Sequence, residues 1–310
     1  DQSNVTSYAA TVVAVVTFEA FGGMWINAFI IFVICMAWVK KKTLNSNEKI
    51  LLFLGCSRFW YLCISSLYYF LSVIHPNYLY VHPIFQLILS IQSLLNYSHL
   101  WVSVCLCVFY CIKIASFQNS FFIYLKVKID RMVPWLLFGS VLFSLLIGML
   151  VYDITDKAFN KNLNYTCQGS IWKASIRVNE HFFPVYFITG FGFVTSFMAV
   201  IFSDLLLLFS LWRHKHNMQT NSMKDLSTDA HIKAMKSILS FLVMNSINFV
   251  FLSLTLNYSS WKQNYVMFLI YVFLCAFPCV HSLILICSNP RLEKTLLRIL
   301  PCLKFMVCMK

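Results

Sequence analysis

Charged residues are scarce in this chain. Asp, Glu, Lys and Arg make up 11% of its 310 residues, whereas soluble domains average about 25%. Glycine, with 8 residues, and proline, with 7, are also few, and no repeat, low-complexity segment or long hydrophilic linker divides the chain. These shortages exclude an ordinary soluble protein. The 60% share of hydrophobic residues indicates a chain that is solvated mostly by lipid.

Long apolar segments account for most of the sequence. They lie at about residues 9–39, 50–74, 83–112, 132–152, 183–212, 232–256 and 265–287. Each is long enough to cross about 30 Å of hydrocarbon as a helix, because a helix rises about 1.5 Å per residue. Helices are required because lipid offers the backbone no hydrogen-bond partner. The sequence therefore predicts an all-α membrane protein, a seven-transmembrane helix bundle in which residues 1–310 form one domain and 288–310 a basic tail.

The positions of Lys and Arg predict the orientation of this bundle. Of the 24, 18 lie in the first, third and fifth connections and in the tail. The positive-inside rule places these segments in the cytoplasm and the amino terminus outside. The first apolar segment is too long for a signal peptide and follows no positive charge, so it is interpreted as a span. The net charge of +13 thus belongs to one membrane face, where it attracts anionic membrane lipid, and it predicts no nucleic-acid partner.

Modification sites are predicted on both sides of the membrane. The sequons that start at Asn4 and Asn164 fall on the outer side, so both residues are predicted N-glycosylation sites. Cys302 and Cys308 lie in the basic, apolar tail and are candidates for palmitoylation.

The 12 cysteines do not predict a redox or metal centre. Nine lie inside apolar segments, where Cys behaves as a small hydrophobe, and Cys167 alone is clearly on the outer side. The pair His214 and His216 has no carboxylate or Cys beside it, which favours a solvated helix end over a metal site. The sequence predicts no metal and no cofactor, and no constellation of residues indicates an enzyme.

Polar residues inside the apolar segments fall into a deep set and an outer set. Such residues face the interior of a bundle, and Gln92, Asn96, His99 and Ser103 share one helix face because their spacings are four, three and four. Two interpretations remain open for the outer set, namely interhelical hydrogen bonding and a ligand pocket between helices. The candidate ligand-binding residues are Gln92, Ser93, Asn96, Thr189, Asn248, Leu252 and Tyr271.

For the deep set, interhelical hydrogen bonding is the favoured interpretation. We expect Arg58 to meet polar partners such as Asn27 or Ser282 inside the bundle. Two acids, Glu19 and Asp204, also fall within apolar segments. The predicted polar core of the bundle consists of Asn27, Arg58, His281 and Ser282.

The segment HLWVSVCLCVFYCIKIA, residues 99–115, resembles the third helix of bitter taste receptors, the type 2 taste receptors. Other segments resemble the same family, in order along nearly the whole chain. They are NAFI at 27–30, LLFLGCSR at 51–58, VPWLL at 133–137, FSLWRH at 209–214, AHIKAMK at 230–236 and PCVHSLILI at 278–286. The chain departs from the family pattern at Ser196, where Pro is frequent, at Asn245 and Asn248, where Tyr is frequent, and at Asp204, where an apolar residue is usual.

This resemblance implies a G-protein-coupled receptor of the plasma membrane that detects bitter small-molecule agonists. It also implies a heterotrimeric G protein of the gustducin type, in the Gi class, followed by phospholipase C and calcium signalling. The G protein would dock at a cytoplasmic rim, whose cations would otherwise be interpreted as membrane anchors. The rim residues that the resemblance implies are Tyr110, Lys113, Arg213, His214, His231 and Lys236.

Three alternatives to this interpretation make different predictions. A receptor for pheromones or lipids on the same fold would have a pocket lined mainly by apolar surface. A secondary transporter would show internal repeats, broken helices and coupled intramembrane acids, and the sequence has no symmetry between its halves. A membrane enzyme would need His or Asp clusters near the interface, which the sequence lacks.

Overall fold

The computed structural model describes residues 2–79, 81–115, 119–163, 183–219, 239–240, 242–251, 253–254 and 265–308. Every regular element in these residues is a helix. In chain order the labelled helices are α1 (Gln2–Lys41), α2 (Ser46–Ile74), α3 (Pro76–Leu79), α4 (Ile84–Ile114), α5 (Ser120–Leu163), α7 (Phe183–Gln219), α9 (Tyr265–Ser288) and α10 (Pro290–Cys308).

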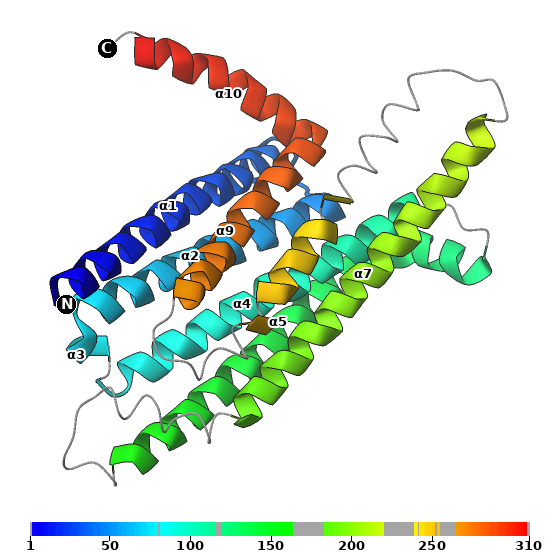
Figure 1. The fold of residues 1–310 in the computed structure, drawn as a ribbon. Helices are drawn as coiled ribbons and strands as arrows, with labels where there is room; N and C mark the ends of the chain where they lie inside the picture. Colours follow the sequence, from blue (N-terminus) through cyan, green and yellow to red (C-terminus); the bar gives the residue numbers. More distant parts are fainter. Residues whose placement is uncertain are drawn as a thin grey trace.

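The long helices lie side by side around α4 (Figure 1). Helix α4 packs against α2, α5 and α7, and α1 packs against α2 and α9. The most apolar stretch of α4 is 67% buried, whereas the corresponding stretches of the other four long spans are 28 to 44% buried. The central position of α4 explains why the residues of its polar face reach several neighbours at once.

Among the residues that the structure describes, five helices are long and apolar enough to cross a membrane. They are Val13–Lys41, Ser46–Leu71, Ile84–Ile114, Ser120–Lys157 and Gly190–Arg213. A sixth span is present if Val272–Ser288 and Pro290–Ile299, which meet at a bend of 98°, are counted as one. The expected span at 232–256 is described only in part, and that part contains the apolar helix Leu242–Phe251.

Helix boundaries differ from the expected spans mainly at the ends. Helix α5 begins at Ser120 and ends at Leu163, well outside the expected 132–152. Exposed polar residues such as Lys126 and Asp130 lie in the added turns. Hydropathy marks only the part of a helix that lies in lipid, and the helix itself continues into water.

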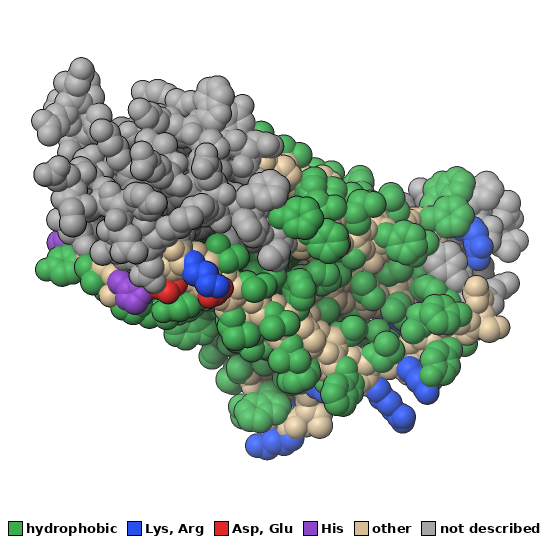
Figure 2. Space-filling model, turned by 90° about the horizontal axis from the view of Figure 1, so that it is seen from below, with side chains coloured by type: hydrophobic (Ala, Val, Ile, Leu, Met, Phe, Trp, Pro, Cys, Tyr) green, Lys and Arg blue, Asp and Glu red, His purple; other side chains and the backbone are tan. Residues whose placement is uncertain are grey.

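Side chains on the outside of the bundle are those expected for a lipid-facing surface. Trp135 is 75% exposed and Phe18 is 82% exposed, and in water so many exposed aromatic rings would form an unfavourable apolar patch. Figure 2 shows hydrophobic side chains over most of the described face, with most of the visible Lys and Arg toward one end of it and one, beside acidic side chains, toward the other. The bundle therefore has an apolar belt and a basic end.

The break between α9 and α10 is built by local sequence. Asn289 accepts a hydrogen bond at its side-chain oxygen from the backbone N–H of Arg291 at 3.0 Å, and Pro290 begins α10, a position that Pro favours. Helix α10 is amphipathic, as in helices that lie in the membrane interface. Arg291 also pairs with Glu48 at the start of α2, which ties α10 to the basic end of the bundle.

Candidate functional site

A buried arginine joins four helices in the middle of the bundle. Arg58 on α2 is fully buried. Its Nη1 donates to Ser282 Oγ on α9 at 3.0 Å, and its Nη2 donates to Ser103 Oγ on α4 at 3.2 Å. Its Nη2 also contacts His281 Nδ1. Ser282 in turn donates to Asn27 Oδ1 on α1 at 2.8 Å, so the structure brings together all four residues of the predicted polar core and adds Ser103.

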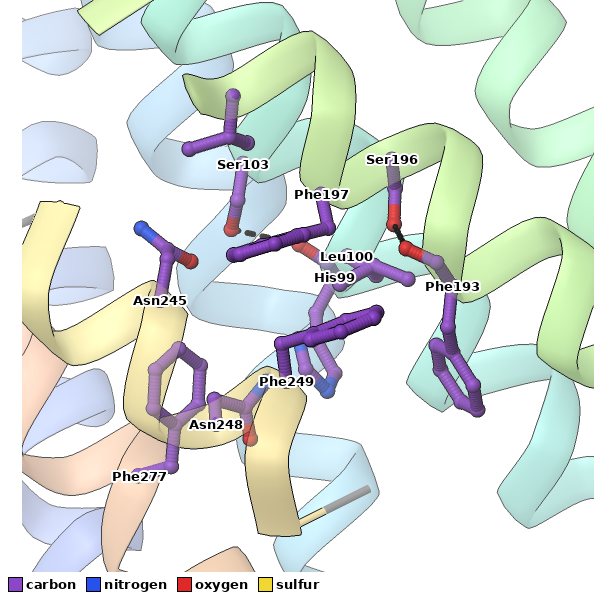
Figure 3. Close-up of a pocket in the computed structure, with 11 residues that line it drawn as sticks. His99, Leu100, Ser103, Phe193, Ser196, Phe197, Asn245, Asn248, Phe249 and Phe277 are labelled. Atoms are coloured by element: carbon purple, nitrogen blue, oxygen red, sulfur yellow. Dashed lines mark hydrogen bonds between the residues drawn. The ribbon is translucent and has the colours of Figure 1, made fainter. Parts of the chain in front are cut away.

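A cavity lies next to this network, between α4, α7, the Leu242–Phe251 helix and α9 (Figure 3). Its polar lining comes from every helix except α9. The polar residues are His99 and Ser103 on α4, Ser196 on α7, and Asn245 and Asn248 on the Leu242–Phe251 helix. Ser103 thus lines the cavity and also accepts a hydrogen bond from Arg58. The sequence pattern placed His99 and Ser103 on the polar face of α4 but did not predict them as ligand-binding residues.

Aromatic rings fill most of the space between these polar groups. Phe197 and Phe249 stack with ring centroids 4.1 Å apart at 6°, and Phe193 and Phe277 complete the aromatic lining. The cavity that remains is small, about 20 Å³. Because small-molecule pockets span roughly 300–1,000 Å³, a ring-bearing ligand must move the stacked rings aside.

Three of the predicted ligand-binding residues lie on α4 about one to two turns toward its amino-terminal end from His99. Gln92 donates through Nε2 to Ser65 Oγ on α2 at 3.2 Å, and Asn96 contacts His99 through Oδ1 and Nε2 at 3.0 Å. Ser93 is half-buried on α4. Asn248 is the one member of the predicted set among the described residues that line the cavity.

The rest of the predicted ligand set cannot be placed by its side chains. Thr189 lies on α7 and Tyr271 on α9, and their side chains fall outside the described part of the chain. Leu252 is outside the described residues. Of the glycosylation sites, Asn4 lies on α1 with an undescribed side chain and Asn164 is outside the described residues.

The described members of the predicted G-protein rim lie at the carboxyl-terminal ends of α4 and α7. The hydroxyl of Tyr110 donates to Asn47 Oδ1 on α2 at 3.1 Å, and Lys113 Nζ pairs with Asp130 Oδ2 on α5 at 2.6 Å. Arg213 is exposed on α7. The side chain of His214 and the residues His231 and Lys236 lie outside the described part of the chain.

Two acids lie inside the bundle. Asp204 on α7 is 4% exposed, and its Oδ2 accepts no hydrogen bond from the residues that the structure describes. Glu19 on α1 likewise has one buried oxygen, Oε2, with no such partner. Within the described ranges, no group of three or more His, Cys, Asp or Glu is placed to hold a metal ion.

A bundle of apolar helices with a polar core, an interhelical cavity and a basic end has the architecture of a multi-pass membrane receptor. Comparison with known families narrows this class. Residues 5–304 match the family model described as Taste receptor protein (TAS2R). The chain belongs to the type 2 taste receptor family, and it is therefore a seven-transmembrane, G-protein-coupled bitter taste receptor rather than an enzyme.

Curated relatives cover nearly the whole chain. Taste receptor type 2 member 2 of Homo sapiens is 30% identical over 289 residues, which are 92% of this chain and 94% of the relative. Taste receptor type 2 member 105 of Mus musculus is 30% identical over 297 residues, 94% of this chain and 96% of the relative. Taste receptor type 2 member 40 of Gallus gallus is 32% identical over 308 residues, 96% of both chains. The family predicted from the third-helix motif is confirmed, as is a location in the plasma membrane.

Proposed function

We propose that bitter agonists of this receptor bind in the cavity between α4, α7, the Leu242–Phe251 helix and α9. The observation that supports this site is the double role of Ser103. Its hydroxyl lines the cavity and also accepts a hydrogen bond from Arg58, which is bonded to α9. An agonist that contacts Ser103 therefore acts on a hydrogen-bond network that spans four helices.

The outer ligand-binding set would form the path into this cavity. Gln92, Ser93 and Asn96 lie on α4 on the amino-terminal side of His99, which is the extracellular side in the orientation set by the positive-inside rule. Thr189, Leu252 and Tyr271 are proposed to complete that path, and Asn248 to contact the agonist in the cavity itself. The polar groups of the cavity favour agonists that form hydrogen bonds over purely acyl ligands such as lipids.

Signal transmission follows from a shift between bundle states. An agonist shifts the population only as far as it binds one state more tightly than the other. The favoured state would admit a gustducin-type, Gi-class G protein between the cytoplasmic ends of the helices, and phospholipase C and calcium release would follow. The proposed docking rim consists of Tyr110, Lys113, Arg213, His214, His231 and Lys236.

Sequence pattern and charge support the proposed arrangement of the rest of the chain. We propose that residues 1–310 form one seven-transmembrane domain with the amino terminus outside, glycosylated at Asn4 and Asn164. The tail at 288–310, which contains the amphipathic α10, would lie on anionic lipid at the cytoplasmic face.

Calcium release in cells that express this chain with a chimeric G protein tests the proposal. Wild-type receptor, Asn248→Ala and Lys113→Ala would be compared against a panel of bitter compounds at matched surface expression. We expect Asn248→Ala to raise the half-maximal agonist concentration and Lys113→Ala to lower the maximal response. A wild-type receptor that reaches the cell surface but responds to no bitter compound would contradict the proposed function. An Asn248→Ala variant with unchanged potency for every agonist would contradict the proposed site.

A further inference from the structure

His99, which lines the cavity, has one ring nitrogen without a hydrogen-bond partner among the described residues. His99 is 3% exposed, and its Nδ1 has no hydrogen-bond partner among the residues that the structure describes. The other ring nitrogen, Nε2, lies 3.0 Å from Asn96 Oδ1. Because an amide oxygen only accepts hydrogen bonds, Nε2 carries the proton and Nδ1 presents its lone pair. The cavity therefore offers a buried acceptor that an N–H or O–H group of a ligand can satisfy.

A positive charge lies just behind the cavity wall. Nη2 of Arg58 is 3.2 Å from Ser103 Oγ, and Ser103 lines the cavity. A ligand atom that bonds to Ser103 at about 2.8 Å would therefore lie within about 6 Å of the guanidinium. None of the described residues that line the cavity is Asp or Glu. At this separation, repulsion between two positive charges is large enough to change affinity at least about tenfold, even at an effective dielectric constant of about 20.

The remaining walls favour a planar ring. The stack of Phe197 on Phe249 shows that flat faces pack well in this space, and Figure 3 shows His99, Asn248 and both rings around the same cavity. A small aromatic ring that replaced one of these phenyl groups would keep the offset stacking that aromatic pairs prefer.

We infer that the cavity selects small, uncharged aromatic compounds that carry a hydrogen-bond donor, and that it discriminates against protonated amines. His99 Nδ1 accepts from the donor, the phenylalanine rings hold the aromatic group, and the Arg58 charge behind Ser103 repels a cation. This selectivity rests on the proposed function, in which the cavity is the agonist site.

Three probes of similar size separate these contributions. Benzamide is uncharged and has a donor, methyl benzoate is uncharged and has none, and benzylammonium is a charged and stronger donor. Calcium release in cells expressing the wild-type receptor would be measured against each. We expect benzamide to act at a concentration at least about tenfold lower than either of the others. Benzylammonium is disfavoured both by the positive charge of Arg58 and by the loss of its own hydration, so its comparison with benzamide tests whether the cavity excludes cations.

Substitutions in the cavity provide matched controls. Asn248→Asp places a carboxylate in the lining and should raise the potency of benzylammonium at least about tenfold, whereas Asn248→Leu, which removes the same amide without adding charge, should not. His99→Phe keeps a ring at the position but removes Nδ1, so benzamide should lose its advantage over methyl benzoate.

Each outcome distinguishes this inference from the proposed function. Equal potency of benzylammonium and benzamide, in a receptor that responds to either, would overturn the selectivity and leave the agonist site intact. No response to the three probes, in a receptor that responds to other bitter compounds, would overturn the inferred ligand class. A receptor at the cell surface that responds to no compound would overturn the proposed function itself.

Discussion

Replacing Ser282 with Ala tests the polar core with a change of one oxygen atom. The Ser282 hydroxyl accepts from Arg58 Nη1 at 3.0 Å and donates to Asn27 Oδ1 at 2.8 Å. Arg58, Asn27 and Ser282 each have 0% exposure, so water cannot replace the lost partner without rearrangement. A hydrogen bond to a charged group contributes about 1.5–3 kcal/mol and a neutral one about 0.5–1.5 kcal/mol. We therefore expect Ser282→Ala to lower the free energy of unfolding by about 2–4 kcal/mol.

Thermal unfolding of the purified receptor with a thiol-reactive dye measures this loss. Cys105 and Cys107 are buried and unbonded to one another, so they react when the bundle opens. The control is Ser288→Ala on the same helix, because Ser288 is exposed and its hydroxyl donates to the backbone of Ile284. Ser282→Ala should unfold several degrees below Ser288→Ala. Equal unfolding temperatures would refute the reasoning that the serine hydroxyl holds Arg58 to α9.

Three further substitutions probe other parts of the bundle. Gly192→Ala would place a Cβ 2.8 Å from Tyr97 Cε1, and the Tyr97 ring is itself buried. Thermal unfolding should therefore show that the free energy of unfolding falls by about 1–3 kcal/mol. An unchanged unfolding temperature would show that the ring moves aside without cost. Asp204→Asn removes a buried charge that has an unbonded oxygen, and we expect it to raise stability by about 1 kcal/mol or more, so a less stable variant would reveal a partner for the carboxylate. Lys113→Ala breaks a partly exposed ion pair with Asp130, which contributes at most about 1 kcal/mol; surface expression should stay near wild type while calcium release falls, and equal losses of both would indicate a structural role alone.

Sequence pattern was most informative where polar residues interrupt lipid-facing helices. The polar face of α4 and the intramembrane Arg58 could be identified because such residues are costly in lipid and must turn inward. The contact of Arg58 with Ser282 was expected, and the structure contains it. Its contact with Ser103 was not expected, because the relative rotation of α2 and α4 depends on packing that no single helix encodes.

The position of the cavity was harder to predict than the polar core. The predicted ligand set centres on Gln92 and Asn96, whereas the cavity lies one to two turns deeper, at His99 and Ser103. The polar spacing along α4 included both levels, so it could not select one of them. The stacked phenylalanines could not be predicted as cavity residues, because nothing in the sequence distinguishes them from the other Phe residues among the 30 in the chain.

The ends of the helices could not be predicted from hydropathy. The sequence pattern located the apolar part of α5, but the helix starts at Ser120, in a segment with the charges Lys126, Lys128 and Asp130. Lys forms helix readily in water. The apolar pattern therefore ends where the lipid ends, whereas the helix continues.

The most direct test of the central claim is the response of Ser103→Ala to an agonist of the wild-type receptor. Binding would be measured alongside calcium release at matched surface expression, with Ser144→Ala as the control. Ser144 is a buried serine that donates to the carbonyl of Ser140 at 2.7 Å, just as Ser103 donates to that of His99 at 2.8 Å, but it lies on α5 away from the cavity lining. Because coupling free energies of about 1–3 kcal/mol correspond to about 5- to 150-fold effects, Ser103→Ala should reduce signalling per bound agonist at least about fivefold while Ser144→Ala does not. Full signalling by Ser103→Ala would contradict a connection from the cavity to the cytoplasmic end through Arg58.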